Sequence, residues 1–487
     1  MKNHFHLLAF VFLTTLNINA QAAVRYVDLN STNPVPPYSN WLTAATNIQV
    51  AIDAANPGDV VLVTNGLYAT GGRQWNQYDA TNRILLTNAV TVQSVNGPAV
   101  TTIQGNRVSS ITNLTNAVRC AYLGAGAVLA GFTLTNGSAG NGNYDNGGGV
   151  AGVTLGTMVS NCVLAGNYAL GSGGGAMGCT LINCVFSNNF AEGGGAAINS
   201  SLINCQIINN TAGWAGGALG GAATNCLFAG NHATNYGGAS GFCTLVNCTL
   251  TANWLQPGGG GNGGGSYYGT LLNCIVYSNA APNGSNWYSS SMNYCCTAPL
   301  AAGSGNITNS PLFVNQTNGD FHLQSNSPCI NAGKNASAAG NADLDGNPRL
   351  QGGTVDLGAF EFQNPASVIS YAWLQQYGLP TDGTADYADT DNDGMNNWQE
   401  WISGTDPTNP LSCFKMLSPS NNISGAAITW ISVGGKTYFL QRGTNLATQP
   451  SFSTIQSNIA GQTGTTTFTD LTATNFPLYF YRVGVQQ

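Results

Sequence analysis

Hydrophobic and polar positions alternate in short runs that recur at a fixed spacing through the middle of the chain. Each unit opens on an apolar pair such as Leu181-Ile182, passes through an Asn-Cys pair and an alternating run, and closes on a glycine cluster. Successive units start 22, 21, 21, 22 and 26 residues apart. The recurring pairs are Asn161-Cys162, Asn183-Cys184, Asn204-Cys205, Asn225-Cys226, Asn247-Cys248 and Asn273-Cys274. A fixed period of this length indicates a solenoid.

Strand-length runs between Gly and Asn turns predict that each unit is one coil of a parallel β-helix, which we assign to residues 23–318. Coils stack at about 4.8 Å, so equivalent residues form rows along the axis. We expect one row to be an amide ladder in which each side chain bonds its neighbours above and below. Its members would be Asn161, Asn183, Asn204, Asn225 and Asn247.

The cysteines form a second predicted row, and the chain has 13 of them. Neighbours in a row would have parallel Cα–Cβ bonds about 4.8 Å apart. A disulfide instead requires Cβ atoms about 3.8 Å apart and a crossed torsion. The row is therefore predicted to be buried thiols acting as small apolar groups. Metal binding there is disfavoured because no histidine accompanies the row.

Both ends of the chain differ from the repeats. Lys2, an apolar stretch from Leu7 to Leu16 and the small residues Ala20 and Ala22 predict a secretory signal peptide over residues 1–22. We therefore expect a protein that is secreted or held at the cell surface, and no later stretch is apolar enough to cross a membrane. Residues 413–487 alternate with period two, which predicts a small antiparallel β-sandwich. Its aromatic core residues would be Trp430, Tyr438, Tyr479 and Tyr481.

Composition narrows the class of protein. Only 6% of residues are charged, the formal net charge is -7, and 64 residues are glycine. With 12 Lys and Arg there is no basic footprint for nucleic acid or anionic lipid. A hydrophobic content of 43% excludes a disordered chain. We expect an all-β monomer whose partner is an extracellular polysaccharide or a surface protein.

Two parts of the solenoid resemble known bacterial families. The run Cys184 to Asn189, followed by Gly193 to Ala196, resembles the repeats of polymorphic outer-membrane proteins and other pectin-lyase-fold proteins. That resemblance implies a right-handed parallel β-helix. Residues Asn47 to Asp59 resemble the segment that starts many such helices. It implies a short amphipathic helix covering the open apolar end of the first coil.

The end of the solenoid carries a more specific resemblance. Three pieces, Ser327 to Gly333, Asp343 to Arg349 and Val355 to Glu361, occur in the order typical of the choice-of-anchor Q domain of bacterial surface proteins. We assign residues 319–364 to this domain, as the end of the β-helix. The resemblance implies a place beside cell-surface anchoring signals.

Residues 365–412 contain one strong candidate for a metal site. The run from Asp389 to Glu400 fits a twelve-residue calcium loop, with oxygen ligands at the required positions and Gly394 at position 6. The expected Ca²⁺ ligands are Asp389, Asp391, Asp393, the backbone carbonyl of Met395, Asn397 and Glu400. The alternative is a solvated acidic turn. This segment resembles thrombospondin type 3-like and dockerin-like calcium repeats, and Asp382, Asp386 and Asp406 are candidates for a second, poorer site.

Candidates for catalysis are few. No Lys or Arg occurs between Arg119 and Lys334, and the repeats contain only two acids, Asp145 and Glu192. These lie 47 residues apart, about two coils or roughly 10 Å, which is close to the carboxylate separation of inverting glycosidases. The alternative is that both are solvated loop residues. His232 is predicted to be an exposed turn residue.

Two functions therefore stay open. The first is a non-catalytic surface protein or adhesin that presents a β-helix face to carbohydrate or protein, with calcium stabilising the linker. The second is a polysaccharide hydrolase or lyase on the same fold. Carboxylates gathered on one face of the coils would favour the enzyme.

Overall fold

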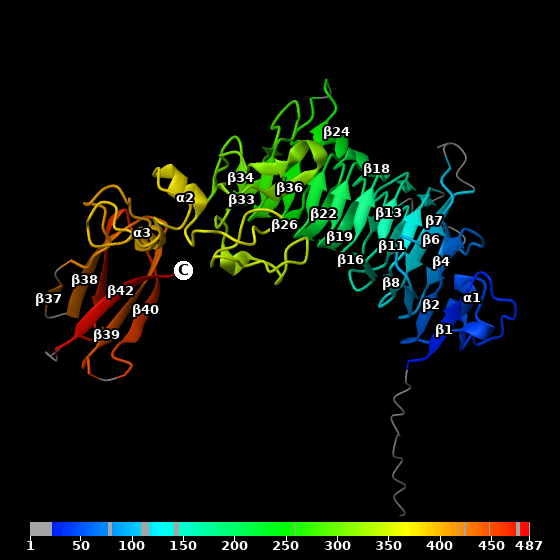
Figure 1. Cartoon of the computed structure of the whole chain (residues 1–487), viewed down its shortest axis with the longest axis horizontal. Coiled ribbons are helices and arrows are strands. Elements are labelled where there is room, and N and C mark those ends of the chain that lie inside the picture. The colour runs from blue at the N-terminus through cyan, green and yellow to red at the C-terminus, as the bar shows by residue number, and fades with distance from the viewer. Residues whose placement is uncertain are drawn as a thin grey trace, which may run out of the picture.

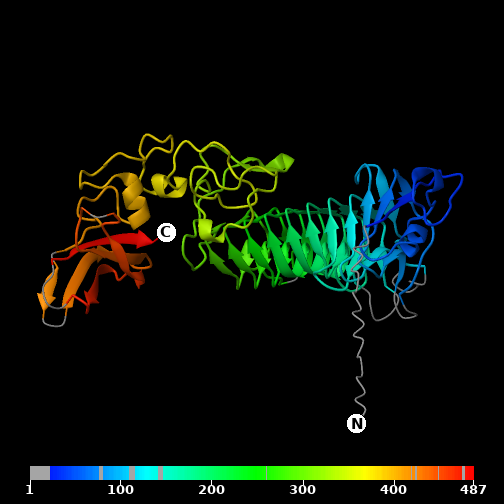
Figure 2. The same cartoon turned by 90° about the horizontal axis from the view of Figure 1, so that it is seen from below.

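Three parallel sheets form the body of the molecule (Figures 1 and 2). The computed structural model describes residues 22–75, 80–108, 116–140, 146–258, 260–417, 419–422, 425–447, 449–473 and 478–486. The predicted signal peptide lies almost wholly outside these residues. Sheets A, B and C have 18, 10 and 6 strands within the described residues, and each strand pairs in parallel with its counterpart in the next coil. The chain therefore winds as a β-helix.

Sheet A has two strands in most coils. Its strands are β1 (Val24–Val27), β2 (Val60–Val63), β4 (Thr81–Leu86), β5 (Thr91–Ser94), β7 (Val118–Leu123), β8 (Val128–Ala130), β11 (Val150–Gly152), β12 (Met158–Ser160), β15 (Ala176–Met177), β16 (Thr180–Ile182), β19 (Ala197–Ile203), β22 (Ala218–Thr224), β25 (Ser240–Gly241), β26 (Thr244–Val246), β29 (Ser266–Tyr267), β30 (Thr270–Leu272), β32 (Trp287–Tyr288) and β33 (Ser291–Asn293).

Sheets B and C have one strand per coil. Sheet B consists of β3 (Gly66–Tyr68), β6 (Thr101–Gln104), β9 (Thr133–Thr135), β13 (Val163–Ala165), β17 (Val185–Ser187), β20 (Gln206–Ile208), β23 (Leu227–Ala229), β27 (Thr249–Thr251), β31 (Ile275–Tyr277) and β34 (Cys296–Thr297). Sheet C consists of β10 (Ser138–Ala139), β14 (Tyr168–Ala169), β18 (Phe190–Gly193), β21 (Thr211–Trp214), β24 (His232–Tyr236) and β28 (Trp254–Leu255).

The asparagines before the repeated cysteines form the corner between sheets A and B. Asn161, Asn183 and Asn204 have φ values of 51, 53 and 52°, the left-handed conformation that asparagine tolerates better than most residues. Their side chains do not form the predicted ladder. Only Asn183 bonds Asn161, at 3.4 Å, and the Asn204 Oδ1 has no partner within the described residues. The prediction was wrong because these corner side chains point outwards.

The asparagine ladder lies instead at the corner between sheets B and C. In each coil the Nδ2 of one asparagine donates to the Oδ1 of the next, at 2.9 to 3.1 Å. The same Oδ1 also accepts the backbone N–H of its neighbour, as Asn210 does from Asn189. The row is fully buried in its central coils. Its members are Asn167, Asn189, Asn210, Asn231, Asn253, Asn279 and Asn286.

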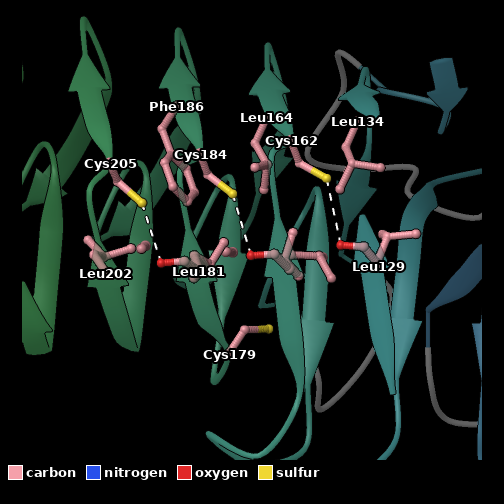
Figure 3. Packing of buried hydrophobic residues seen from close by; sticks show 14 of the residues in the cluster. Leu129, Leu134, Cys162, Leu164, Cys179, Leu181, Cys184, Phe186, Leu202 and Cys205 are labelled. Carbon is pink, nitrogen blue, oxygen red and sulfur yellow. Dashed lines mark hydrogen bonds between the residues drawn. The ribbon is translucent and has the colours of Figure 1, made fainter. Parts of the chain in front are cut away.

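The repeated cysteines point into the core (Figure 3). All 13 are buried free thiols in the structure. The Sγ of Cys184 donates to the carbonyl of Val159 in the preceding coil at 3.5 Å, and that of Cys205 to Leu181 at 3.4 Å. Burial raises the pKa of Cys162 to about 11, so the neutral thiol is favoured. The row acts as packing groups that each satisfy a backbone carbonyl.

A short helix, α1 (Ile48–Asp53), packs on the N-terminal coils (Figure 1). Asn47 caps it through its side chain, which accepts the N–H of Gln49 at 2.8 Å. Ile48, Ala51 and Ile52 are buried and join the core of the β-helix. The helix lies within the segment predicted to cap the first coil.

Residues 319–364 double back along the side of the last coils, so we call them the strap (Figure 2). They begin with β36 (Asp320–Leu323), which forms a hairpin with β35 (Phe313–Asn315). The Ala359 N–H donates to Thr249 Oγ1, and the Lys334 N–H donates to Asn273 Oδ1. Outward side chains of sheet B, including Leu227 and Ile275, are buried in this contact. The strap therefore covers a flank of the helix in addition to following its last coil.

Two short helices connect the strap to the C-terminal module. They are α2 (Tyr371–Gln376) and α3 (Asn397–Ser403). The module has two three-stranded antiparallel sheets, in the orders β37 (Ser420–Asn422), β38 (Gly425–Ser432), β41 (Gly464–Asp470) and β40 (Ser453–Ala460), β39 (Thr437–Gly443), β42 (Phe480–Gln486). Trp430 and Tyr438 are fully buried between them, whereas Tyr479 and Tyr481 are half-buried.

The predicted fold class is confirmed: the chain is mostly β, with a parallel β-helix, few helices and small C-terminal antiparallel sheets. Within the residues that the structure describes, no helix is both long enough and apolar enough to span a membrane.

Candidate functional site

A cluster of five aromatic side chains, which we call the platform, lies in the last coils where the end of β24 of sheet C meets sheet A. It consists of Tyr236, Phe242, Tyr267, Tyr268 and Tyr288. The Tyr267 ring is stacked on Tyr236 with centroids 4.7 Å apart and on Tyr288 at 5.8 Å. The Phe242 ring is stacked on Tyr268 at 5.7 Å. Parallel pairing of β25, β29 and β32 aligns successive coils and so produces the Tyr267–Tyr288 and Phe242–Tyr268 stacks.

The exposed members of the platform are held in a strained backbone conformation. Phe242 and Tyr268 have φ values of 55 and 50°, and their side chains are 59% and 50% exposed. The equivalent position in the preceding coils is Gly178, Asn199 and Gly220, residues that tolerate this conformation. A bulky residue there costs about 1–3 kcal/mol, and such strain is typical of functional sites.

The platform is polar at its rim but uncharged. From Tyr236 to Tyr288 the sequence contains no Asp, Glu, Lys, Arg or His. Burial, with the neighbouring phenols of Tyr268, Tyr236 and Tyr288, raises the pKa of Tyr267, so its hydroxyl stays protonated at neutral pH. The arrangement offers ring faces and hydroxyls. It suits a ligand that stacks on rings and exchanges neutral hydrogen bonds.

Of the two acids considered for catalysis, only Glu192 lies within the described residues. Asp145 lies outside the described residues, so its separation from Glu192 is not measured. Glu192 is exposed on β18 and lies near Tyr168, whose ring is stacked on Phe190 at 5.4 Å. The Arg107 guanidinium lies over the same Tyr168 ring, 5.6 Å from its centroid. Glu192 is thus on sheet C rather than beside the platform.

His232 is not the exposed turn residue that the sequence predicted. It lies in β24 and is half-buried, with its ring stacked on Trp254 at a centroid distance of 3.7 Å. Burial lowers its pKa, which favours the neutral ring. The parallel register of β24 and β28 places these two rings in one row.

The acidic loop brings three predicted metal ligands together. Carboxylate oxygens of Asp389, Asp391 and Asp393 all lie within 4.8 Å of one another. The N–H groups of Asp393 and Gly394 donate to Asp389, which folds the loop tightly. Gly394, at φ 95°, supplies the left-handed turn expected at position 6. This is an acidic triad that could hold a metal ion.

Glu400 completes the candidate site from α3. It is fully buried, and its Oε2 has no partner within the described residues; the same is true of Oδ2 of Asp391 and Asp393. Burial, with the nearby carboxylates of Asp391 and Asp393, raises the pKa of Glu400 to about 7. Buried carboxylate oxygens without a donor are expensive unless a cation neutralises them, so this donor set fits a hard cation.

The two remaining predicted ligands have other contacts. The Asn397 side chain is buried and already bonded, donating to the Ala385 carbonyl and accepting from Thr390 Oγ1. It therefore fixes the loop against α3, and the second lone pair of its Oδ1 is left for a cation. For Met395 the predicted ligand is the backbone carbonyl, and the contact is made by the side chain instead. Its sulfur accepts the N–H of Phe414 at 3.1 Å, which links the loop to the C-terminal module.

The acids considered for a second site have separate structural roles. Asp386 is buried and accepts from Ser367 Oγ at 2.6 Å and from the Val368 N–H. Asp382 and Asp406 each accept from a threonine two residues later. Asp382 and Asp406 hold local turns, and among the described residues none of the three belongs to a cluster of metal-ligating side chains.

Sequence reasoning missed the platform and a buried charge network in the strap. Arg349 and Glu361 are buried with Nη1 and Oε2 3.6 Å apart, and Arg349 Nη2 donates to Asn225 Oδ1 at 2.8 Å. Both residues belong to the pieces that resemble the choice-of-anchor Q domain. The signal for the platform was Tyr268, standing where earlier coils have Gly178, Asn199 and Gly220.

Comparison with known proteins finds distant structural neighbours only. No family model matches the chain, and no curated protein matches it in sequence. The solved structure of pectate lyase Pel9A is 16% identical with a TM-score of 0.44, covering 71% of this chain and 97% of the lyase. A rhamnogalacturonan lyase is 12% identical (TM-score 0.35, covering 68% and 90%), and pectin methylesterase PemA from Erwinia chrysanthemi is 10% identical (0.28, 56% and 80%).

The parallel β-helix of this chain is given by the pairing of its own strands, and its structural neighbours are two polysaccharide lyases and a pectin methylesterase. At these identities and TM-scores, residue roles do not carry over to this chain.

Proposed function

We propose that this protein is exported, as a secreted or cell-surface protein, and binds an extracellular polysaccharide on the platform. The observation that carries the proposal is the stacked aromatic cluster of Tyr236, Phe242, Tyr267, Tyr268 and Tyr288, of which Phe242 and Tyr268 are exposed and held in a strained backbone conformation. Ring faces that pack on sugar CH groups, with hydroxyls alongside, are well suited to carbohydrate. A stack that extends over successive coils favours a polymer over a small ligand.

Charge narrows the class of polysaccharide. The platform coils carry no charged side chain, so nothing there would neutralise a uronate or sulfate group. A buried, unpaired anion on a neutral aromatic surface is strongly disfavoured. The ligand is therefore an uncharged polysaccharide.

The test exploits the strain at Tyr268. Tyr268→Asn copies the residue that an earlier coil has at this position, Asn199, so it should raise the free energy of unfolding by about 1 kcal/mol. It should also weaken binding to xylan, mannan or cellulose by at least tenfold, since it removes a ring. Phe190→Ala, which removes an exposed ring on sheet C, is the control and should bind like the parent protein.

Pull-down of each polysaccharide and denaturant unfolding give the two readouts. Unchanged affinity in Tyr268→Asn would overturn the platform as the binding site. Equal binding of polygalacturonate and xylan would overturn the preference for an uncharged ligand.

A polysaccharide-active enzyme is the second candidate, and Glu192 is the observation that favours it. Its carboxylate is exposed beside the Tyr168 and Phe190 rings, with the Arg107 guanidinium over Tyr168. Glycosidases use a pair of carboxylates as acid and base, and Glu192 would supply one of the two. Release of reducing or unsaturated ends that disappears in Glu192→Gln would establish this function; products that persist in Glu192→Gln would exclude Glu192 from the reaction.

We further propose that the acidic loop binds Ca²⁺. Three clustered aspartates and the buried Glu400 form an all-oxygen donor set, which calcium prefers. The role is structural, because the loop joins the strap region to the C-terminal module and lies far along the chain from the platform (Figure 1).

A further inference from the structure

A cavity of about 600 Å³ lies where the last coil meets the two helices of the linker. One wall is the end of the β-helix, with Tyr294, Ile307 and Asn309, and the other is α2 with Trp373. Trp401 of α3 lines it as well. Its volume falls within the range of pockets that hold small molecules. Figure 1 shows α2 between the last strands of the β-helix and α3.

The two tryptophans are held by packing on one side and line the cavity on the other. Both are half-buried and pack against a small core of Ile369, Leu374 and Ala385. The Trp373 ring is further fixed by Tyr377, edge to face at 5.0 Å. Side chains positioned in this way present ring surface at little further entropic cost on binding.

The polar groups of the cavity are amides and hydroxyls. Gln375, Gln376, Asn309 and Thr308 are exposed residues that line it, and none of the lining residues is charged. The Lys334 ammonium lies outside the lining, 5.8 Å from the Tyr294 ring centroid. A cavity without charge offers no counter-ion to an acidic or basic ligand.

We propose that this cavity is a second carbohydrate site, which takes one or two sugar units of an uncharged glycan. Indole rings would stack on the apolar face of a pyranose while the amides pair with its hydroxyls. Apolar peptides lack the hydroxyls that these amides would pair with. The proposal shares its ligand class with the platform but rests on different residues, so each can fail without the other.

The experiment measures binding of cellohexaose, xylohexaose, mannohexaose and hexagalacturonate to the full chain by calorimetry and by tryptophan fluorescence. Thr308→Arg adds a long side chain at the mouth of the cavity without removing a core group. In the Tyr268→Asn background, in which the platform is disabled, at least one neutral hexaose should bind, and Thr308→Arg and Trp401→Ala should each weaken that binding at least tenfold. Hexagalacturonate should bind at least tenfold more weakly than the neutral hexaose.

Two controls separate this cavity from general damage and from the platform. Trp398→Ala removes a ring of the same helix α3 that does not line the cavity, so affinity should be unchanged. Tyr268→Asn should also leave hexaose binding at the cavity unchanged. The proposal is overturned if no neutral hexaose binds, if Thr308→Arg binds like the parent while retaining its circular dichroism spectrum, or if only Tyr268→Asn abolishes binding.

Discussion

Each coil uses asparagine for two different purposes at two different corners. At the corner between sheets A and B the residue is chosen for its left-handed backbone, as at Asn204. At the corner between sheets B and C it is chosen for its amide, as at Asn210, which is fully buried and bonded to both neighbouring coils. Spacing alone does not distinguish these uses, because both rows have the same period.

Replacing Asn210 should therefore be much more damaging than replacing Asn204. Asn210→Ala leaves the N–H and the amide of Asn189 without their acceptor. At about 1–3 kcal/mol for each buried group, the free energy of unfolding should fall by about 2–6 kcal/mol. Asn204→Gly keeps the left-handed corner and should change it by less than about 1 kcal/mol. Denaturant unfolding of both variants measures these two changes. An equal loss of unfolding free energy in Asn210→Ala and Asn204→Gly would contradict the ladder assignment.

At the scale of elements, the strap explains which corner asparagines are buried. Asn161 and Asn183 are exposed, whereas Asn225 is buried because it donates to the carbonyls of Ala339 and Ala342 in the strap. Burial of the Arg349 and Glu361 pair follows from the same contact. Sequence resemblance located the pieces of the strap, but only their long-range contacts show which flank they cover.

Protonation of His322 in β36 should strengthen the contact between the start of the strap and Asp345 further along it. Its Nδ1 is 2.6 Å from Asp320 and its Nε2 is 2.6 Å from Asp345, a strap residue. Burial opposes protonation, but the two carboxylates outweigh it and raise the pKa of His322. This stabilisation is present below the unfolded pKa and is lost as the pH rises through the folded pKa.

Hydrogen exchange of the strap measured between pH 5 and 8, corrected for the intrinsic rate, should therefore show protection that decreases as the pH rises. His322→Gln should reduce that dependence without abolishing it, because burial also raises the pKa of Asp356 in the strap to about 7. An identical pH profile in the variant would contradict this role for His322.

The calcium loop should respond to pH in a related way. Because the folded chain without a cation holds a proton on Glu400 up to about pH 7, its free energy of unfolding decreases as the pH rises from 4.5 towards 7. Calcium replaces that proton, so calcium should raise the melting temperature of the linker more at pH 8 than at pH 5. Glu400→Gln should abolish the calcium effect at both values. A calcium effect as large at pH 5 as at pH 8 would contradict ligation by Glu400.

At the scale of the whole molecule, the cores of the β-helix and of the C-terminal module are separate clusters among the described residues, with the clusters of the strap and linker between them along the chain. Cys205 and Phe186 belong to the core of the β-helix, whereas Trp430 and Tyr438 belong to the C-terminal module. Calorimetry should show two transitions. Asn210→Ala should lower only the transition of the β-helix, and a single transition shifted as a whole would show that the two cores unfold together.

The sequence predicted the whole-molecule architecture because its evidence is periodic. Period, glycine clusters and the row at Cys162 to Cys274 all indicate stacked coils, and alternation indicates the C-terminal sheets. The acidic loop was predictable because its ligands are close in sequence. The platform and the cavity were not, since each depends on residues from separate coils or helices, such as Tyr236 with Tyr288, or Tyr294 with Trp373.

The asparagine ladder also gives the coil stack an electrical direction. Each Nδ2 donates to the next asparagine in the direction of the C-terminal coils, from Asn167 to Asn286, and each also donates to a backbone carbonyl, such as that of Leu164 in the coil before Asn189. The amide dipoles are therefore aligned head to tail, and each polarises the next. An interruption at Asn231 would divide the row into two short dipoles, whereas one at Asn279 would only shorten it. The interior of the solenoid is thus polar along its axis, although the chain around it is nearly devoid of charge.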